Sequence, residues 1–199
     1  MKIILHRRNT LEELHDTDKE YGVEVDVRSN NNELIIHHDP LTDDKELTLK
    51  QWLKVYKHDT LIVNIKEEGL EKYILQLLEE FNIEDFFFLD QSFPFLIIKK
   101  NLVKCKTALR FSEYESFDTI KKSISFANWV WIDCFTQYPS IDTIQLEFLR
   151  KHKVKLCLVS PELQGHSLES FVHDHKSLIS KYKIDAVCTK HPEFWKNFS

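Results

Sequence analysis

The feature that most constrains the fold of this chain is a repeated alternation of short apolar segments with helix-like segments along 199 residues. The apolar segments have the length and the β-branched or aromatic content of buried strands. Eight of them take part in the alternation: 2–5, 23–27, 61–66, 86–89, 105–111, 129–132, 154–159 and 186–188. Helices are expected between them, over 10–20, 49–56, 70–81, 94–100, 115–123, 141–152 and 168–182, with a last one from 192.

Eight strand–helix units in one chain predict an α/β fold with a parallel sheet and the helices outside it. Eight is also the number of strands that closes a (β/α)8 TIM barrel, so we predict a compact barrel of that class. No linker rich in Pro, Gly or Ser and no shift in composition divides the chain. The sequence therefore predicts a single domain over residues 1–199.

Composition excludes several classes of function. A formal net charge of −5 and the lack of a long basic run argue against a nucleic-acid partner. The apolar run 86–98 is interrupted by Asp90, Gln91 and Pro94, so it does not predict a transmembrane segment. With only three glycines, the chain has no dinucleotide-binding fingerprint and no phosphate-binding loop of the Walker type. No leader segment is evident, and we expect a cytoplasmic protein.

The stretch 21–40 carries the strongest chemical signal. Glu24 and Asp26 alternate with valines in a strand-like segment, so both carboxylates project from one face. Two like charges on a buried face repel each other and lose their hydration, which predicts a cation between them. A polar turn at 29–32 and a short strand at 34–36 then return the chain to His37 and His38, of which strand alternation allows only one to face the carboxylates. Oxygen ligands beside an imidazole indicate metal-assisted acid–base chemistry.

Other strand ends carry polar residues of a similar kind. Active sites of TIM barrels lie at the C-terminal ends of the strands, where this chain has His6, Arg7, Asn64, Lys66, Arg110, Asp133 and Glu162. Arginine suits a phosphate group because its planar fork donates two hydrogen bonds. Structural roles are the alternative: a surface ion pair for Arg7 or Arg110, a helix cap for Asp133, and a salt bridge from Lys66 or Arg28 to the carboxylate pair.

These residues resemble a known family, the glycerophosphodiester phosphodiesterases, within the barrel superfamily that includes phosphatidylinositol-specific phospholipase C. His6-Arg7 and Asn9-Thr10 match the family's opening motif, although Arg8 stands where glycine is usual. Glu24 and Asp26 resemble its Glu-x-Asp metal pair, and His38-Asp39 resembles its His-Asp dipeptide, which favours His38 over His37. The family's third acidic metal ligand lies two residues before a lysine, and here Asn64 precedes Lys66. Later segments are similar to a short bacterial or phage-type branch.

The resemblance implies an enzyme of lipid metabolism, a phosphoric diester hydrolase that acts on a small glycerophosphodiester. It implies Mg²⁺ or Ca²⁺ bound by Glu24, Asp26 and Asn64, and an acid–base pair formed by His6 and His38. Arg7, Lys66 and Arg110 would bind phosphate, with Asp133 and Glu162 as additional site residues. Two alternatives stay open: a lyase that releases a cyclic phosphate, and a non-catalytic barrel that binds a phosphodiester or polyol phosphate.

Overall fold

The structure is a computed structural model that describes residues 1–40, 47–102, 106–169, 176, 179 and 181–198. Its elements fall into two units, one of residues His6–Lys104 and the other of Met1–Leu5 together with Cys105–Ser199. Strands and helices alternate along the chain in both units. No helix in the described residues is both long enough and apolar enough to cross a bilayer.

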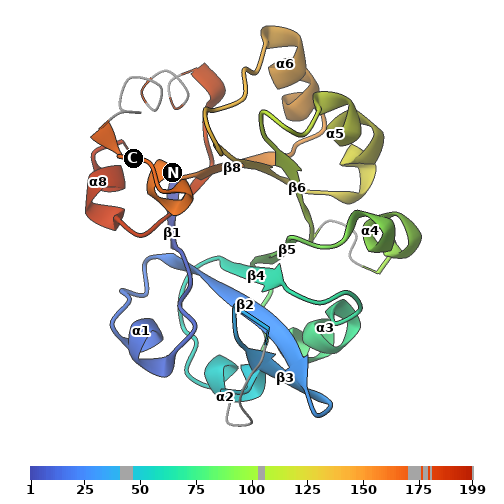
Figure 1. The fold of residues 1–199 in the computed structure, drawn as a ribbon, viewed down its shortest axis with the longest axis vertical. Helices are drawn as coiled ribbons and strands as arrows, with labels where there is room; N and C mark the ends of the chain where they lie inside the picture. The colour runs from blue at the N-terminus through green and yellow to red at the C-terminus, as the bar shows by residue number, and fades with distance from the viewer. Residues whose placement is uncertain (41–46, 103–105, 170–175, 177–178, 180, 199) are drawn as a thin grey trace. The chain divides into compact units, whose positions relative to one another are not determined.

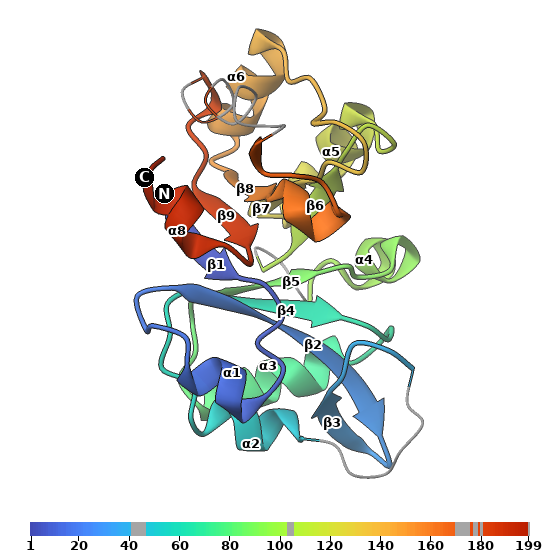
Figure 2. The same cartoon turned by 60° about the vertical axis from the view of Figure 1, so that its left-hand side comes forward.

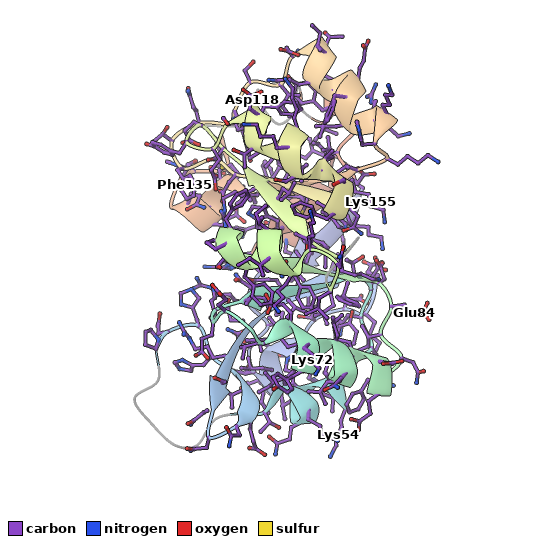
Figure 3. The ribbon with its side chains drawn as sticks, turned by 90° about the vertical axis from the view of Figure 1, so that its right-hand side faces the viewer. Lys54, Lys72, Glu84, Asp118, Phe135 and Lys155 are labelled. Atoms are coloured by element: carbon purple, nitrogen blue, oxygen red, sulfur yellow. The ribbon has the colours of Figure 1, made fainter. Side chains whose placement is uncertain are left out.

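The unit His6–Lys104 is built on a parallel sheet in the order β5-β4-β2. Figure 2 shows helices α1, α2 and α3 on one face of these strands, with Lys54 and Lys72 exposed on the surface of the helices (Figure 3). The strands are β2 (Gly22–Asn30), β3 (Glu33–Ile36), β4 (Leu61–Ile65) and β5 (Phe86–Leu89), and the helices are α1 (Leu11–His15), α2 (Leu49–Leu53), α3 (Glu71–Glu80) and α4 (Phe93–Lys99).

A two-residue hairpin returns the chain beside β2. β3 pairs with β2 in antiparallel register, with Asn30 opposite Glu33, so the loop consists of Asn31 and Asn32 alone. Both have positive φ, 47° and 64°, a backbone conformation that asparagine tolerates better than most residues and that matches the twist of the strands. The hairpin brings the His37-His38 segment back beside Asp26, whose carbonyl accepts from the His37 amide at 3.2 Å, as the sequence predicted.

The second unit holds a five-stranded parallel sheet in the order β1-β9-β8-β7-β6. Figure 1 shows α5, α6 and α8 beside these strands. The strands are β1 (Lys2–Leu5), β6 (Ala108–Phe111), β7 (Trp129–Ile132), β8 (Lys155–Val159) and β9 (Ala186–Thr189), and the helices are α5 (Phe117–Ser123), η1 (Ile124–Phe126), α6 (Thr143–Lys151), η2 (Pro161–Gln164) and α8 (Pro192–Lys196).

All eight strands of the predicted alternation are present, and β3 is the expected insertion. The first helix is shorter than predicted, because it ends at His15 rather than near residue 20. There the Thr17 hydroxyl donates to the Glu13 carbonyl at 2.8 Å, and a side chain that bonds the backbone in this way competes with continuation of the helix. The helix predicted over 168–182 falls mostly outside the described residues. The single domain over residues 1–199 stays a prediction.

A buried tryptophan attaches α2 to the segment that follows β1. The indole Nε1 of Trp52 donates to the Arg8 carbonyl at 2.8 Å, and the ring stacks on Tyr56 with 5.3 Å between centroids. Arg8 does not have the positive φ that would require glycine, although its neighbour Arg7 does. The backbone therefore accommodates arginine where the family pattern has glycine.

We expect Trp52→Phe to lower the free energy of unfolding by about 1–3 kcal/mol, because it leaves the Arg8 carbonyl without its buried donor. Urea denaturation should show a lower midpoint with an unchanged slope. Trp131→Phe is the matched control, since the Trp131 indole nitrogen makes no hydrogen bond with a described residue. An equal loss of stability in both variants would show that ring volume, and not the hydrogen bond, is responsible.

Candidate active site

Two buried carboxylates on β2 form the centre of the site. Glu24 and Asp26 are 1% and 0% exposed, and they share one face of the strand while Val23, Val25 and Val27 occupy the other. The neighbouring strand β4 places Asn64 in register with Asp26. Burial of two carboxylates is unfavourable unless other groups compensate their charge.

Asp26 is compensated by cations and by an amide. Lys66 Nζ lies 3.1 Å from Asp26 Oδ1, and Arg7 Nε lies 3.6 Å from Asp26 Oδ2. Asn9 makes two hydrogen bonds with the same residue: its Nδ2 donates to Asp26 Oδ2 at 2.8 Å, and its Oδ1 accepts from the Asp26 amide at 3.0 Å. The carboxylate of Asp26 is therefore contacted by side chains from the segment before β2 and from the segment after β4.

Glu24 accepts hydrogen bonds from neutral donors, and its surroundings still disfavour the charged form of its carboxyl group. The Arg7 amide donates to its Oε2 at 2.7 Å and Asn64 Nδ2 donates to its Oε1 at 2.8 Å. Burial, and then the charge of Asp26, raise the pKa of Glu24 to about 7 against the opposing effect of these hydrogen bonds and of Lys66. The site around Glu24 would thus be stabilised by additional positive charge.

Both candidate histidines lie at this site. His6 Nε2 is 3.6 Å from Glu24 Oε2, and the imidazole is mostly buried. Arg7 contacts His38 Nε2 through one guanidinium nitrogen, and its φ of 50° lets its amide reach Glu24 while its side chain reaches His38. His37 instead directs Nδ1 to the Asp39 carbonyl at 2.6 Å. Of the two adjacent histidines, His38 is the one that contacts Arg7.

These contacts define the protonation of His38. A guanidinium only donates, so His38 Nε2 must accept, and its proton then lies on Nδ1. Nδ1 is 2.8 Å from Asp39 Oδ1, and this hydrogen bond lowers the pKa of Asp39. Such a carboxylate–imidazole pair orients the ring and leaves Nε2 as a proton acceptor. The tautomer is inferred from the hydrogen-bond network.

Arg28 joins the segments that carry His38 and Lys66. Its Nε and Nη2 donate to the His38 carbonyl at 3.2 and 3.0 Å, and its Nη1 reaches the Lys66 carbonyl at 3.5 Å. Glu67 completes the arrangement, because it accepts from Arg28 at 3.4 Å and from the Ser29 amide at 3.1 Å. Arg28 lies on the same face of β2 as Glu24 and Asp26, and its hydrogen bonds hold the backbone at His38 and Lys66 in place.

The oxygen atoms around Glu24 and Asp26 form a donor set that a divalent cation could use. Asn64 Oδ1 is buried and makes no hydrogen bond with a described residue, which leaves an uncharged oxygen beside two carboxylates. Oxygen donors of this kind suit Mg²⁺ or Ca²⁺. No three His, Cys, Asp or Glu side chains in the described residues gather as a metal cluster, since the third position is an amide. The residues fit a cation, with less negative charge than three carboxylates would supply.

Arg110 and Asp133 form an ion pair in the other unit. The Arg110 guanidinium contacts Asp133, lies 3.8 Å from Glu115 Oε1, and is 5.8 Å from the centroid of Phe135. Asp133 also accepts from Gln164 Nε2 at 2.8 Å. The alternative of an ion pair for Arg110 is thus present. The role of Arg110 in phosphate binding stays a prediction, as does that of Asp133 as a site residue.

Glu162, also in that unit, links the ends of two strands. Its Oε1 accepts from the Thr189 hydroxyl at 2.6 Å and from the Lys190 amide at 2.9 Å, and its Oε2 accepts from Ser160. These bonds join the loop after β8 to the end of β9. The structure assigns Glu162 this structural contact, and its role as an additional site residue stays a prediction.

Comparison with known proteins adds information on the fold. No family model matches the chain, and no curated protein matches it in sequence. A solved structure of a glycerophosphodiester phosphodiesterase from Agrobacterium tumefaciens matches with a TM-score of 0.67 and 12% identity, over 98% of this chain and 99% of that one. A glycerophosphoryl diester phosphodiesterase from Parabacteroides distasonis matches with a TM-score of 0.62 and 14% identity, over 99% of this chain and 85% of that one.

The chain has the glycerophosphodiester phosphodiesterase fold. This (β/α)8 TIM-barrel class was predicted from the strand alternation, and it is confirmed over nearly the whole chain. In this fold the residues that follow the strands stand at the end where barrel active sites lie. His6, Arg7, Glu24, Asp26, His38, Asn64 and Lys66 come together within one unit of the structure.

Sequence reasoning missed two residues of this site. Asn9 was named only in the Asn9-Thr10 match to the family's opening motif, yet Thr10 caps α1 and Asn9 makes two hydrogen bonds with Asp26. Arg28 was considered only as an alternative partner of the carboxylates, yet it binds backbone carbonyls. The period of two along β2, which places Arg28 on the face of Glu24 and Asp26, was the available signal.

We expect Arg28→Lys to disturb the orientation of His38, because an ammonium cannot reproduce the fork that spans two carbonyls. Side-chain ¹⁵N NMR should show a protonated Nδ1 and an unprotonated Nε2 for His38 in the wild type, and mixed or broadened signals in the variant. Arg150→Lys, on the exposed side of α6, is the control. Identical His38 signals in Arg28→Lys and wild type would contradict the assigned role.

Proposed function

We propose that this chain is a metal-dependent phosphodiesterase that hydrolyses a glycerophosphodiester-type substrate. The observation that carries the proposal is the His38–Asp39 pair, held by Arg7 beside the buried carboxylates Glu24 and Asp26. A site that only binds a phosphodiester has little use for an oriented proton acceptor. The fold shared with two glycerophosphodiester phosphodiesterases supports the substrate class.

Each residue has a role that follows from its contacts. His38 Nε2 is the proton acceptor once substrate displaces the Arg7 contact, and His6 is the candidate partner that protonates the leaving oxygen. Arg7 and Lys66 would bind non-bridging phosphate oxygens, because both already lie at the site and carry positive charge. Arg28 and Asn9 would hold this arrangement without touching substrate.

Glu24, Asp26 and Asn64 would hold the metal, Mg²⁺ or Ca²⁺. When bound, such an ion polarises a phosphoryl oxygen and offsets the charge that develops in the transition state. The electrostatics support this, since Arg7 and Lys66 both pair with Asp26, whereas Glu24 is held by neutral donors and has a raised pKa that a cation would offset. A divalent ion would add two positive charges beside an anionic substrate.

A screen of glycerophosphodiesters, with and without added divalent metal, tests the proposal. We expect ³¹P NMR to show the phosphomonoester and the free alcohol, and His38→Gln to lower turnover by about 100- to 10,000-fold. His37→Gln is the matched control and should retain activity, because His37 bonds to the Asp39 carbonyl rather than to Arg7.

The same screen distinguishes the other functions. A cyclic phosphate product would identify a lyase that uses a hydroxyl of the substrate. Binding of a phosphodiester without turnover, in the presence of every metal tested, would identify a non-catalytic barrel, the function that the loss of an acidic residue at Asn64 favours. Either result would overturn hydrolysis.

We expect Asn64→Glu to tighten binding of Mg²⁺ or Ca²⁺ by about tenfold or more, because it adds a negative charge to the donor set. Calorimetric titration and metal-dependent melting temperatures measure this without reference to activity. Gln76→Glu, which adds the same charge on the exposed face of α3, is the control. Equal metal affinity in Asn64→Glu and wild type would remove Asn64 from the metal site.

A further inference from the structure

An exposed apolar patch lies on α4 and the turn that follows it. Among the large hydrophobic side chains that are exposed in the described residues, four fall within ten positions of the chain: Phe93 (48%), Ile97 (44%), Ile98 (73%) and Leu102 (41%). Pro94 is exposed as well. Single exposed apolar residues are ordinary, but a contiguous group of this kind marks an interaction surface. We refer to these five residues as the α4 patch.

The helix is anchored so that this face stays outward. Phe95 and Leu96 are buried on the opposite side of α4. The Ser92 hydroxyl accepts from the Phe95 amide at 3.2 Å and donates to Glu68 Oε2 at 2.5 Å, which ties the start of the helix to the segment after β4. Phe93 and Ile97 are one turn apart, with Pro94 and Ile98 beside them, so the apolar face is continuous. α4 can be followed after β5 in Figure 1.

Two lysines lie at the end of α4, one turn after the buried Phe95 and Leu96, and therefore beside the apolar face rather than within it. Lys99 and Lys100 are exposed and form no ion pair with a described residue, and residues 92–102 include no Asp or Glu. This local charge contrasts with the net charge of −5 of the whole chain. Apolar side chains next to lysines are typical of helices that lie at the surface of an anionic bilayer.

We propose that the α4 patch binds the surface of a membrane that contains anionic lipid, with the apolar side chains entering the head-group region and Lys99 and Lys100 contacting phosphates. Contact with a second copy of the chain through the same surface is the alternative that the experiment distinguishes. The proposal goes beyond the phosphodiesterase function and does not depend on it.

Co-sedimentation of the full chain with vesicles tests the proposal. We expect binding to phosphatidylcholine vesicles that contain about one-third phosphatidylglycerol, weaker binding to pure phosphatidylcholine, and a loss of binding as salt is raised. Ile98→Asp should weaken the partition by at least about tenfold, because it places a charge in the centre of the patch. Replacing both lysines with glutamate should weaken it by about twentyfold or more, since each lysine contributes about fivefold.

Ile144→Asp is the matched control, because Ile144 is equally exposed, at 76%, on α6. It should bind vesicles as the wild type does, and circular dichroism should show that all variants are folded. Wild-type protein that fails to sediment with anionic vesicles, or equal losses in Ile98→Asp and Ile144→Asp, would overturn the proposal. So would light scattering that shows a wild-type dimer converted to a monomer by Ile98→Asp, which would assign the patch to contact between copies.

Discussion

The burial of two carboxylates on one face of β2 is the constraint on which the site depends. Glu24 and Asp26 are almost completely enclosed, and like charges in that setting are tolerated only when donors and cations surround them. Arg7 and Asn9 meet this requirement from the segment before α1, and Asn64 and Lys66 meet it from the end of β4. Strand pairing and the loops at the strand ends thus bring the compensating groups to these two carboxylates.

Asn64 lowers the number of negative charges at this site. A carboxylate at that position would add a third negative charge, whereas the amide donates to Glu24 with one end and leaves its oxygen available with the other. Arg7 and Lys66 both pair with Asp26, and Glu24 accepts from neutral donors. A cation bound there would meet fewer opposing charges and would polarise a phosphate oxygen more strongly, at the expense of its own affinity.

Several residues at the site hold other side chains in place. Arg28 binds the carbonyls of His38 and Lys66, two residues that follow different strands, and Asp39 sets the tautomer of His38. A proton acceptor is effective only in the correct orientation, so these outer contacts determine what the imidazole can do. They also explain why His38, and not its neighbour His37, joins the site.

The sequence by itself determined the class of fold and most members of the site. Strand length, apolar content and eightfold repetition are local properties, and strand alternation places Glu24 and Asp26 on one face whatever surrounds them. It did not determine the partners of each side chain. Arg28 could be assigned from sequence only to the carboxylate pair, until pairing of β2 with β3 and β4 brings the carbonyls of His38 and Lys66 to it. The contact of Asn9 with Asp26 likewise depends on how the loop before α1 lies against β2. Hydrogen bonds and ion pairs depend on distances across the chain, and only the tertiary structure decided those.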